Sequence, residues 1–344
     1  MARLRNGVTD SVSLLVDSPV RALVGPGRSG TTWAGTIVDS CPDVIYRFEP
    51  FHRLGAIDPE FRGWFQKLKD QAVDSADVPR LYELLRTADP LVNKAPFFSR
   101  KSYGLRTFGR RALWPAARAL APANWLYRRA YTPSVGAPVV FKEVTFIKPL
   151  RNLLEHTSVP VVYLVRHPCA TVLSEVRGLD RRRQPPREAR LREFLLEHSP
   201  SLIDRFPEVV SGRDVVSRTA LLWRCEVEIC ASLVGSSPRG LLITYEQLAG
   251  DAYSQSGRLL AHLGLSYGEE TRQYLDSLHG VRKDATGGPR RTGWGNKHFS
   301  VYRNPKEEKD AWKKRIPSET RSKIEAVLEG SAPIERLAAL GGWS

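Results

Sequence analysis

The amino-acid sequence predicts a single α/β domain, in which a P-loop-like parallel β-sheet is flanked by helices and carries helical insertions. Three observations favour this fold class. Short β-branched runs bounded by turns recur along the chain. Each run is followed by the spacing of a helix. The chain of 344 residues, 42% of them hydrophobic, is long enough to bury one large core.

Four apolar runs are the expected strands, and a helical pattern follows each of them. The strands are expected at 20–24, 139–142, 161–165 and 241–245. The helices after them are expected at 31–41, 146–156, 169–177 and 246–263. Because alternating strands and helices build a parallel sheet, we expect ligands to bind at the carboxyl ends of the strands.

Two segments interrupt this alternation. Residues 55–138 are mostly helical in pattern, with many Pro and Trp, and are interpreted as an insertion. Residues 179–239 begin with a basic, Pro-containing loop and continue as a long helix around 215–234. Near the end of the chain, a basic loop at 280–305 precedes helices that start near Pro305 and Pro317.

Charge and cysteine content narrow the function. The chain has 52 Lys plus Arg against 37 Asp plus Glu, a net charge of +15 that predicts an anionic partner. Its four cysteines are widely spread and form no CxxC pair, which argues against a disulfide scaffold and favours a reducing, cytoplasmic location. No run approaches the ~18 apolar residues of a membrane span. We expect no metal site.

The first motif directly follows an expected strand and opens a helix, as a phosphate site requires. Its glycines let backbone N–H groups converge with a helix N-terminus on one anion. A Walker A loop would carry Lys after its second Gly, and here that position is Thr31, which disfavours a P-loop kinase. The candidate phosphate-binding residues are Gly27, Arg28, Ser29, Gly30, Thr31, Thr32 and Trp33.

A second strand-turn-helix segment covers residues 161–174. Arg166 is expected to leave the strand end, and Ser174 to lie about two turns into the helix. A guanidinium and a hydroxyl there form a second anion site. Two such sites on one sheet suggest a nucleotide that carries phosphates on both sides of its ribose.

At these motifs the chain resembles the sulfotransferases that use 3′-phosphoadenosine 5′-phosphosulfate (PAPS). The segment 27–33 is similar to their 5′-phosphosulfate loop, and Arg166-His167-Pro168 to their Arg-Asp-Pro motif. In motif order the chain is most similar to carbohydrate 6-O-sulfotransferases and tyrosylprotein sulfotransferases. Three further segments fit in order: 48–50 (FEP), 243–248 (ITYEQL) and 299–305 (FSVYRNP).

The resemblance implies in-line sulfuryl transfer from PAPS, leaving 3′-phosphoadenosine 5′-phosphate (PAP), without a metal. Glu49 is the implied general base, with a pKa raised by partial burial, and His52 is the alternative. Lys142 is assigned to the leaving-group oxygen, with Lys94 as its rival. Arg28 is expected both to bind the 5′-phosphosulfate and to act as a catalytic residue on the sulfuryl group that is transferred.

The 3′-phosphate is implied to lie against Arg166, Ser174 and Tyr245, with Ser300 and Arg303 closing over it from the loop at 280–305. His167 stands where the family has an acid, and its effect stays open. The insertion at 55–138 is expected to cap the acceptor side, together with the loop at 179–200.

The acceptor is expected to be a hydroxyl of a carbohydrate or glycosylated metabolite, with a phenolic or other secondary-metabolite hydroxyl as the alternative. The net charge could also mean a nucleic-acid-binding protein, but no nucleic-acid motif accompanies it. A basic aromatic region at 106–131 could contact either the acceptor or an anionic membrane. The sequence does not indicate an oligomeric state.

Overall fold

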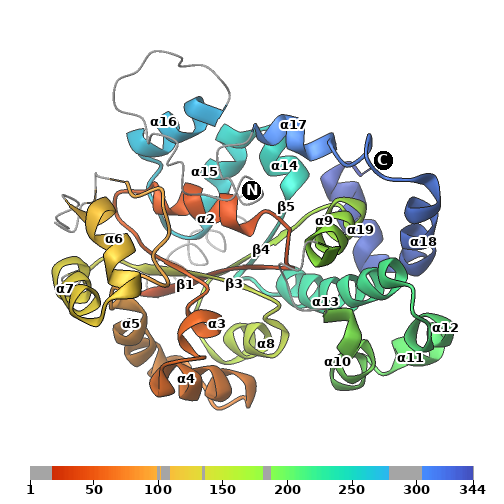
Figure 1. The fold of residues 1–344 in the computed structure, drawn as a ribbon, viewed down its shortest axis with the longest axis horizontal. Helices are drawn as coiled ribbons and strands as arrows, with labels where there is room; N and C mark the ends of the chain where they lie inside the picture. Colours follow the sequence, from red (N-terminus) through yellow and green to blue (C-terminus); the bar gives the residue numbers. More distant parts are fainter. Residues whose placement is uncertain are drawn as a thin grey trace, which may run out of the picture.

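A five-stranded parallel sheet forms the centre of the molecule (Figure 1). The computed structural model describes residues 18–98, 101, 109–133, 136–180, 187–278 and 304–343. The strand order is β2-β3-β1-β4-β5, so β1 lies between β3 and β4. This architecture confirms the predicted α/β class. The strands are β1 (Val20–Gly25), β2 (Ile45–Phe48), β3 (Val139–Val144), β4 (Val161–Val165) and β5 (Gly240–Thr244).

The edge strand β2 was not predicted from the sequence. It has only four residues, and Arg47 interrupts its apolar run. Arg47 is nevertheless buried, because its guanidinium donates to the backbone carbonyl of Leu85 at 2.8 Å and to Oδ1 of Asn93 at 3.0 Å. A buried arginine whose partners come from distant segments leaves no local signal.

Helices cover both faces of the sheet, and each face has its own apolar core. On β3, Val139 and Phe141 face one core, whereas Val140 faces the other. The first core packs beneath α3 (Pro50–Leu54), α4 (Pro59–Lys69), α5 (Val78–Arg86), α8 (Ile147–His156) and α13 (Val215–Ser236). The second packs beneath α2 (Thr31–Asp39), α14 (Tyr245–Gly250), α15 (Ala252–His262) and α16 (Glu269–Leu278).

Two helical predictions needed correction. The expected helix at 246–263 is two helices, because Asp251 ends α14 and its carboxylate accepts the Ser254 N–H at 3.2 Å as the cap of α15. The last helix, α19 (Ala332–Gly341), was not predicted. The expected helices near 305 and 317 are present as α17 (Pro305–Asp310) and α18 (Ser318–Leu328).

The segment 55–138 divides into two structural parts. Its first half, α4 and α5, packs into the core beneath the sheet. Its second half, α6 (Arg110–Ala119) and α7 (Ala121–Tyr131), forms a small cluster of its own around Tyr127, at the left edge of Figure 1. The remaining elements are η1 (Ser75–Asp77), α9 (Pro168–Asp180), η2 (Arg187–Arg190), α10 (Leu191–His198), α11 (Ser201–Arg205) and α12 (Pro207–Ser211).

Parts of the predicted site lie outside the described residues. These are almost all of the loop at 280–305, with Ser300 and Arg303, and the stretch 181–186 of the second insertion. Within the ranges that the structure describes, no helix is long and apolar enough to cross a membrane.

Candidate active site

The two predicted anion-binding segments lie side by side at the carboxyl end of the sheet. They follow β1 and β4, which pair in parallel with Val24 opposite Tyr163. A direct contact joins them, because Arg28 Nε donates a hydrogen bond to Ser174 Oγ at 2.9 Å. The structure therefore brings together residues that are 146 positions apart in the chain.

The first loop has the backbone and the burial of a tight turn around a polar group. Gly30 has φ +93° at the N-cap of α2, and a Cβ there would lie 2.5 Å from Cδ2 of Tyr245. Ser29 is fully buried, and its Oγ has no hydrogen-bond partner among the described residues. Nε1 of the buried Trp33 also lacks one there. Buried polar atoms of this kind are usually satisfied by a ligand or by water.

Thr31 and Thr32 occupy the first turn of α2, next to this loop. Thr31 is buried and Thr32 half-buried. Arg28, which follows Gly27, has a left-handed backbone conformation with φ +66°, as Gly30 does. The predicted 5′ loop is thus a turn that leads directly into the N-terminus of α2, with two threonines in the first helical turn.

Tyr245 connects the first motif with Arg166. The Arg166 guanidinium lies over the Tyr245 ring, 4.4 Å from its centroid, and the ring meets Trp33 edge-to-face at 5.5 Å. Arg166 Nη2 donates to the Glu308 carbonyl at 2.7 Å, while its buried Nε has no hydrogen-bond partner in the described part of the chain. The guanidinium is therefore held in place with donor capacity left over.

His167, which stands where the family has an acid, acts as a neutral helix cap. Its Nδ1 accepts the Cys169 N–H at 3.2 Å, and its ring stacks on Trp312 at 4.1 Å. Burial, together with Lys313 and other nearby cations, lowers the pKa of His167 to about 3. An uncharged ring nitrogen thus accepts a backbone N–H at the start of α9.

Glu49 forms an ion pair with Lys142. Their Oε1 and Nζ atoms are 2.5 Å apart, with side chains 19% and 2% exposed, and Arg53 Nε lies 3.3 Å from Oε2. Burial raises the pKa of Glu49, but Lys142 and Arg53 outweigh it, so the net shift is downward. The expectation of a raised pKa was therefore wrong, because Lys142 was expected at the leaving group and not against this carboxylate.

Both candidate lysines lie against the same aromatic ring. Nζ of Lys94 is 4.3 Å and Nζ of Lys142 is 4.7 Å from the Phe48 ring centroid. Burial and the charge of Lys142 together lower the pKa of Lys94 to about 8. Lys94 is half-buried, whereas Lys142 is fully buried, so only Lys94 retains solvent access.

His52 has a carboxylate partner that the sequence reasoning missed. Its Nδ1 lies 2.5 Å from Oε2 of Glu143, which is fully buried and also accepts the Phe51 N–H at 2.7 Å. Burial lowers the pKa of His52, but the hydrogen bond and charge of Glu143 outweigh it, so the net shift is upward. An acidic residue in a strand as apolar as β3 was the available signal.

Two consecutive residues of β3 therefore hold the two candidate bases. Lys142 pairs with Glu49, and Glu143 pairs with His52. Successive side chains of a strand point to opposite faces, and the two contacts lie on opposite sides of the sheet end. Either Glu49 or the His52–Glu143 pair could accept a proton from a hydroxyl. Among the described residues, no cluster of His, Cys, Asp and Glu suited to a metal ion is found.

Comparisons with known proteins return sulfotransferases. The chain is 14% identical to the sulfotransferase domain from the curacin biosynthetic pathway (TM-score 0.44), over 90% of this chain and 96% of that one. It is 15% identical to the sulfotransferase domain from the Synechococcus PCC 7002 olefin synthase (TM-score 0.43), over 90% of this chain and 93% of that one. It is 12% identical to mouse sulfotransferase SULT7A1, solved with PAP (TM-score 0.44; 98% and 96% covered).

No protein-family model matches the chain, and no curated protein matches it in sequence. The three similar structures belong to the class that the sequence motifs resemble. At such identities a likeness bears on fold alone, so a function has to be argued from the residues of this chain.

Proposed function

We propose that the protein is a sulfotransferase that moves the sulfuryl group of PAPS to an acceptor hydroxyl. One observation carries the proposal: the Arg28–Ser174 hydrogen bond joins the two anion-binding segments. If the two anion sites lay far apart, each would be expected to bind a ligand of its own. Two sites that share a hydrogen bond suit one ligand with phosphates at both ends of a nucleoside.

The residues present fit such a nucleotide. The loop at 27–32 would hold the 5′ end, and Ser29 Oγ is a buried hydroxyl without a protein partner among the described residues. Arg166 would hold the 3′-phosphate through its remaining donors, with Ser174 and Tyr245 beside it. Ser300 and Arg303 remain proposed contacts from the closing loop. PAPS itself supplies the activated sulfuryl group and a phosphate as leaving group.

Glu49 is our proposed general base. Its lowered pKa keeps it ionised at neutral pH, so it can accept the proton of the acceptor hydroxyl. Lys142 fixes the Glu49 carboxylate, as their 2.5 Å contact supports. The assignment of Lys142 to the leaving group remains a proposal, and the half-buried Lys94 is the better placed rival, because it can reach a ligand while Lys142 is enclosed.

His52 is the alternative base. Glu143 holds its Nδ1, which leaves Nε2 for a proton acceptor role. The side chain is 40% exposed, so an acceptor hydroxyl can approach it. The raised pKa of His52 makes it the stronger base of the two but charges more of it at neutral pH.

The acceptor that we propose is a hydroxyl of a carbohydrate or glycosylated metabolite. The FEP segment at 48–50 supports this choice through its likeness to carbohydrate 6-O-sulfotransferases. A phenolic or other secondary-metabolite hydroxyl is the alternative. We place the acceptor near Lys94, in a pocket that the helical segment 55–138 and the loop at 179–200 would line.

Titration calorimetry with PAP and with ATP tests the nucleotide. We expect PAP to bind and ATP to bind far more weakly, because ATP lacks the 3′-phosphate that Arg166 would hold. Arg28→Ala and Arg166→Ala should each weaken PAP binding about tenfold or more, the loss of a charge-assisted hydrogen bond. Equal affinity for PAP and ATP would contradict the proposal. A screen of hydroxyl acceptors with sulfur-labelled PAPS then identifies the acceptor.

A further inference from the structure

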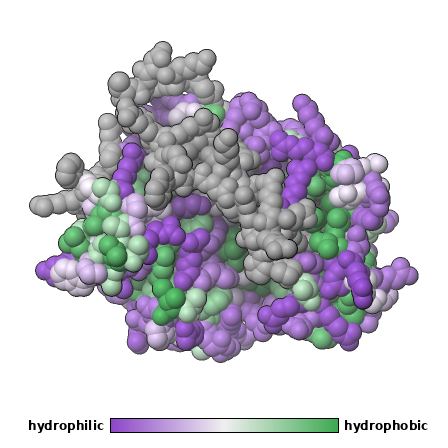
Figure 2. Space-filling model, in the orientation of Figure 1, coloured by the Kyte–Doolittle hydropathy of each residue, from purple (hydrophilic) through white to green (hydrophobic). Residues whose placement is uncertain are grey.

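The hairpin of α6 and α7 carries an exposed apolar surface at one end of the molecule. Trp125 is 64%, Leu120 59% and Leu126 48% exposed. Figure 2 shows apolar and hydrophilic side chains gathered at the edge where Figure 1 places these two helices. Three large apolar side chains so close in sequence and so open to solvent form a patch of the kind that marks an interaction site.

The same hairpin is strongly basic. No Asp or Glu occurs between Asp89 and Glu143. Four arginines are exposed on the hairpin, and none of them takes part in an ion pair within the described ranges. They are Arg111, Arg118, Arg128 and Arg129. The basic residues between the two acidic ones are Lys94, Arg100, Lys101, Arg106, Arg110, Arg111, Arg118, Arg128, Arg129 and Lys142.

The basic and apolar groups are mixed on one surface. The Arg118 guanidinium lies 4.9 Å from the Trp114 ring centroid, and that of Arg129 lies 5.8 Å from Trp125. A hollow of about 680 Å³ between the helices is lined by Arg118, Leu120 and Trp125, among others. Exposed guanidinium groups next to indole rings supply both a charge for acidic headgroups and an amphipathic ring for the boundary between hydrocarbon and headgroups.

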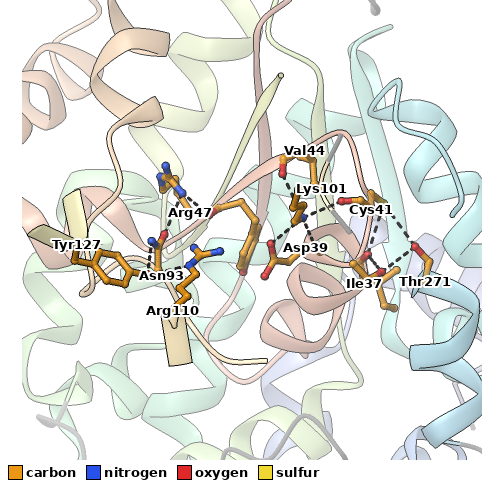
Figure 3. A network of polar contacts seen from close by, with 12 residues as sticks. Ile37, Asp39, Cys41, Val44, Arg47, Asn93, Lys101, Arg110, Tyr127 and Thr271 are labelled. Atoms are coloured by element: carbon orange, nitrogen blue, oxygen red, sulfur yellow. Dashed lines mark hydrogen bonds and ion pairs between the residues drawn. The ribbon is translucent and has the colours of Figure 1, made fainter. Parts of the chain in front are cut away.

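The hairpin does not need this surface for its own folding, because its inner face is firmly attached. Trp114 Nε1 donates to the carbonyls of Pro90 at 2.9 Å and Asn93 at 3.0 Å. The Tyr127 hydroxyl accepts from Asn93 Nδ2 at 2.9 Å and from Arg110 Nε at 3.1 Å (Figure 3). The outer side chains are therefore presented on a rigid support.

We propose that the α6–α7 hairpin lies on the surface of an anionic lipid bilayer. Arginines attract acidic headgroups, and Trp125, Leu120 and Leu126 enter the boundary below them. Nucleic acid or an acidic glycan would use the arginines but would gain nothing from two exposed leucines. The membrane is the occupant that uses both kinds of side chain. The proposal does not depend on sulfuryl transfer.

Docking would also orient the candidate active site. Asn93, which the hairpin holds through Tyr127 and Trp114, is the neighbour of Lys94. Because the attachment is rigid, a docked hairpin would fix the distance of the lysine from the lipid surface.

Co-sedimentation of the full chain with vesicles tests the proposal. We expect binding to vesicles of phosphatidylglycerol and phosphatidylcholine in equal parts, and weak binding to phosphatidylcholine alone. A basic residue near an anionic surface contributes roughly fivefold in binding, so R118E/R128E/R129E should weaken binding about 100-fold or more. R258E/R213E/K314E changes the net charge equally at exposed positions elsewhere and should retain most of the binding.

A second variant separates a membrane from a soluble polyanion. W125S/L126S keeps every charge and should still weaken vesicle binding about tenfold, since buried apolar area is lost. A Tm of each variant close to that of the wild type shows that it is folded. The proposal is overturned if both charge-reversal variants bind alike, or if heparin binds as tightly as the vesicles while W125S/L126S changes nothing.

Discussion

Replacing Glu49 with Gln removes the charge that faces the buried Lys142 ammonium. Breaking one side of a buried ion pair costs about 3–5 kcal/mol. The Gln amide keeps an acceptor, and Glu49 is 19% exposed, so we expect a loss of about 2–3 kcal/mol in the free energy of unfolding. Unfolding entropy is about 2.1 cal/mol/K per residue, so 344 residues give about 0.7 kcal/mol/K and a Tm lower by about 3–4 °C.

The same substitution should lower turnover by roughly 10²-fold if Glu49 is the base. The double variant Glu49→Gln/Lys142→Met separates the two effects, because it removes the unpaired ammonium and keeps a side chain of similar length. We expect its Tm to return to within about 2 °C of the wild type while turnover stays low. Calorimetric unfolding and a PAPS turnover assay measure the two quantities.

Two results would refute this reasoning. A Tm of Glu49→Gln equal to that of the wild type would mean that the ion pair does not stabilise the fold. Turnover restored in the double variant would mean that Glu49 only neutralises Lys142 and takes no proton. His52 would then be the base to test.

The remaining predictions concern the base and the first loop. With Glu49 as base, its lowered pKa predicts turnover that is flat across neutral pH; with His52, turnover rises with pH through a midpoint above 6.5, since only the neutral ring accepts a proton. In the second case Glu143→Gln should move the midpoint down, because the carboxylate that favours the charged ring is gone. Gly30→Ala should lower stability by about 1–3 kcal/mol and weaken PAP binding, because φ is +93° and Tyr245 is in the way. Gly257→Ala, within α15 and with nothing near its Cβ, is the matched control and should be neutral or stabilising; equal effects of the two would contradict the account of the loop.

Much of the sheet could be predicted, because four of its five strands are marked by an apolar run in the local sequence. A buried strand in a parallel sheet is an apolar run, and such a run is visible in the sequence alone. The missed strand, β2, contains Arg47, whose burial depends on carbonyl groups that other segments supply. Hydrogen bonds to residues far away in the chain cannot be read from the sequence around Arg47.

The candidate site follows the same rule. The motif around Gly30 and the Arg166 turn were visible, because loop-to-helix transitions have a recognisable composition. The lowered pKa of Glu49 and the partner of His52 were not visible, because both depend on which side chains meet across the sheet end. The helix after His167 was expected, but its capping role was not, because that role depends on the ring turning its Nδ1 toward the Cys169 N–H.

The adjacency of Lys142 and Glu143 constrains how the site can vary. Both sit on one interior strand that is hydrogen-bonded on its two sides, and one residue of strand advance is about 3.3 Å. A shift of β3 by a single position would turn Lys142 and Glu143 each to the opposite face of the sheet, so both would lose their present partners. Neither contact can be adjusted by sliding the strand without spoiling its counterpart, so variation in the proton-accepting chemistry has to come from α3 and its preceding residue.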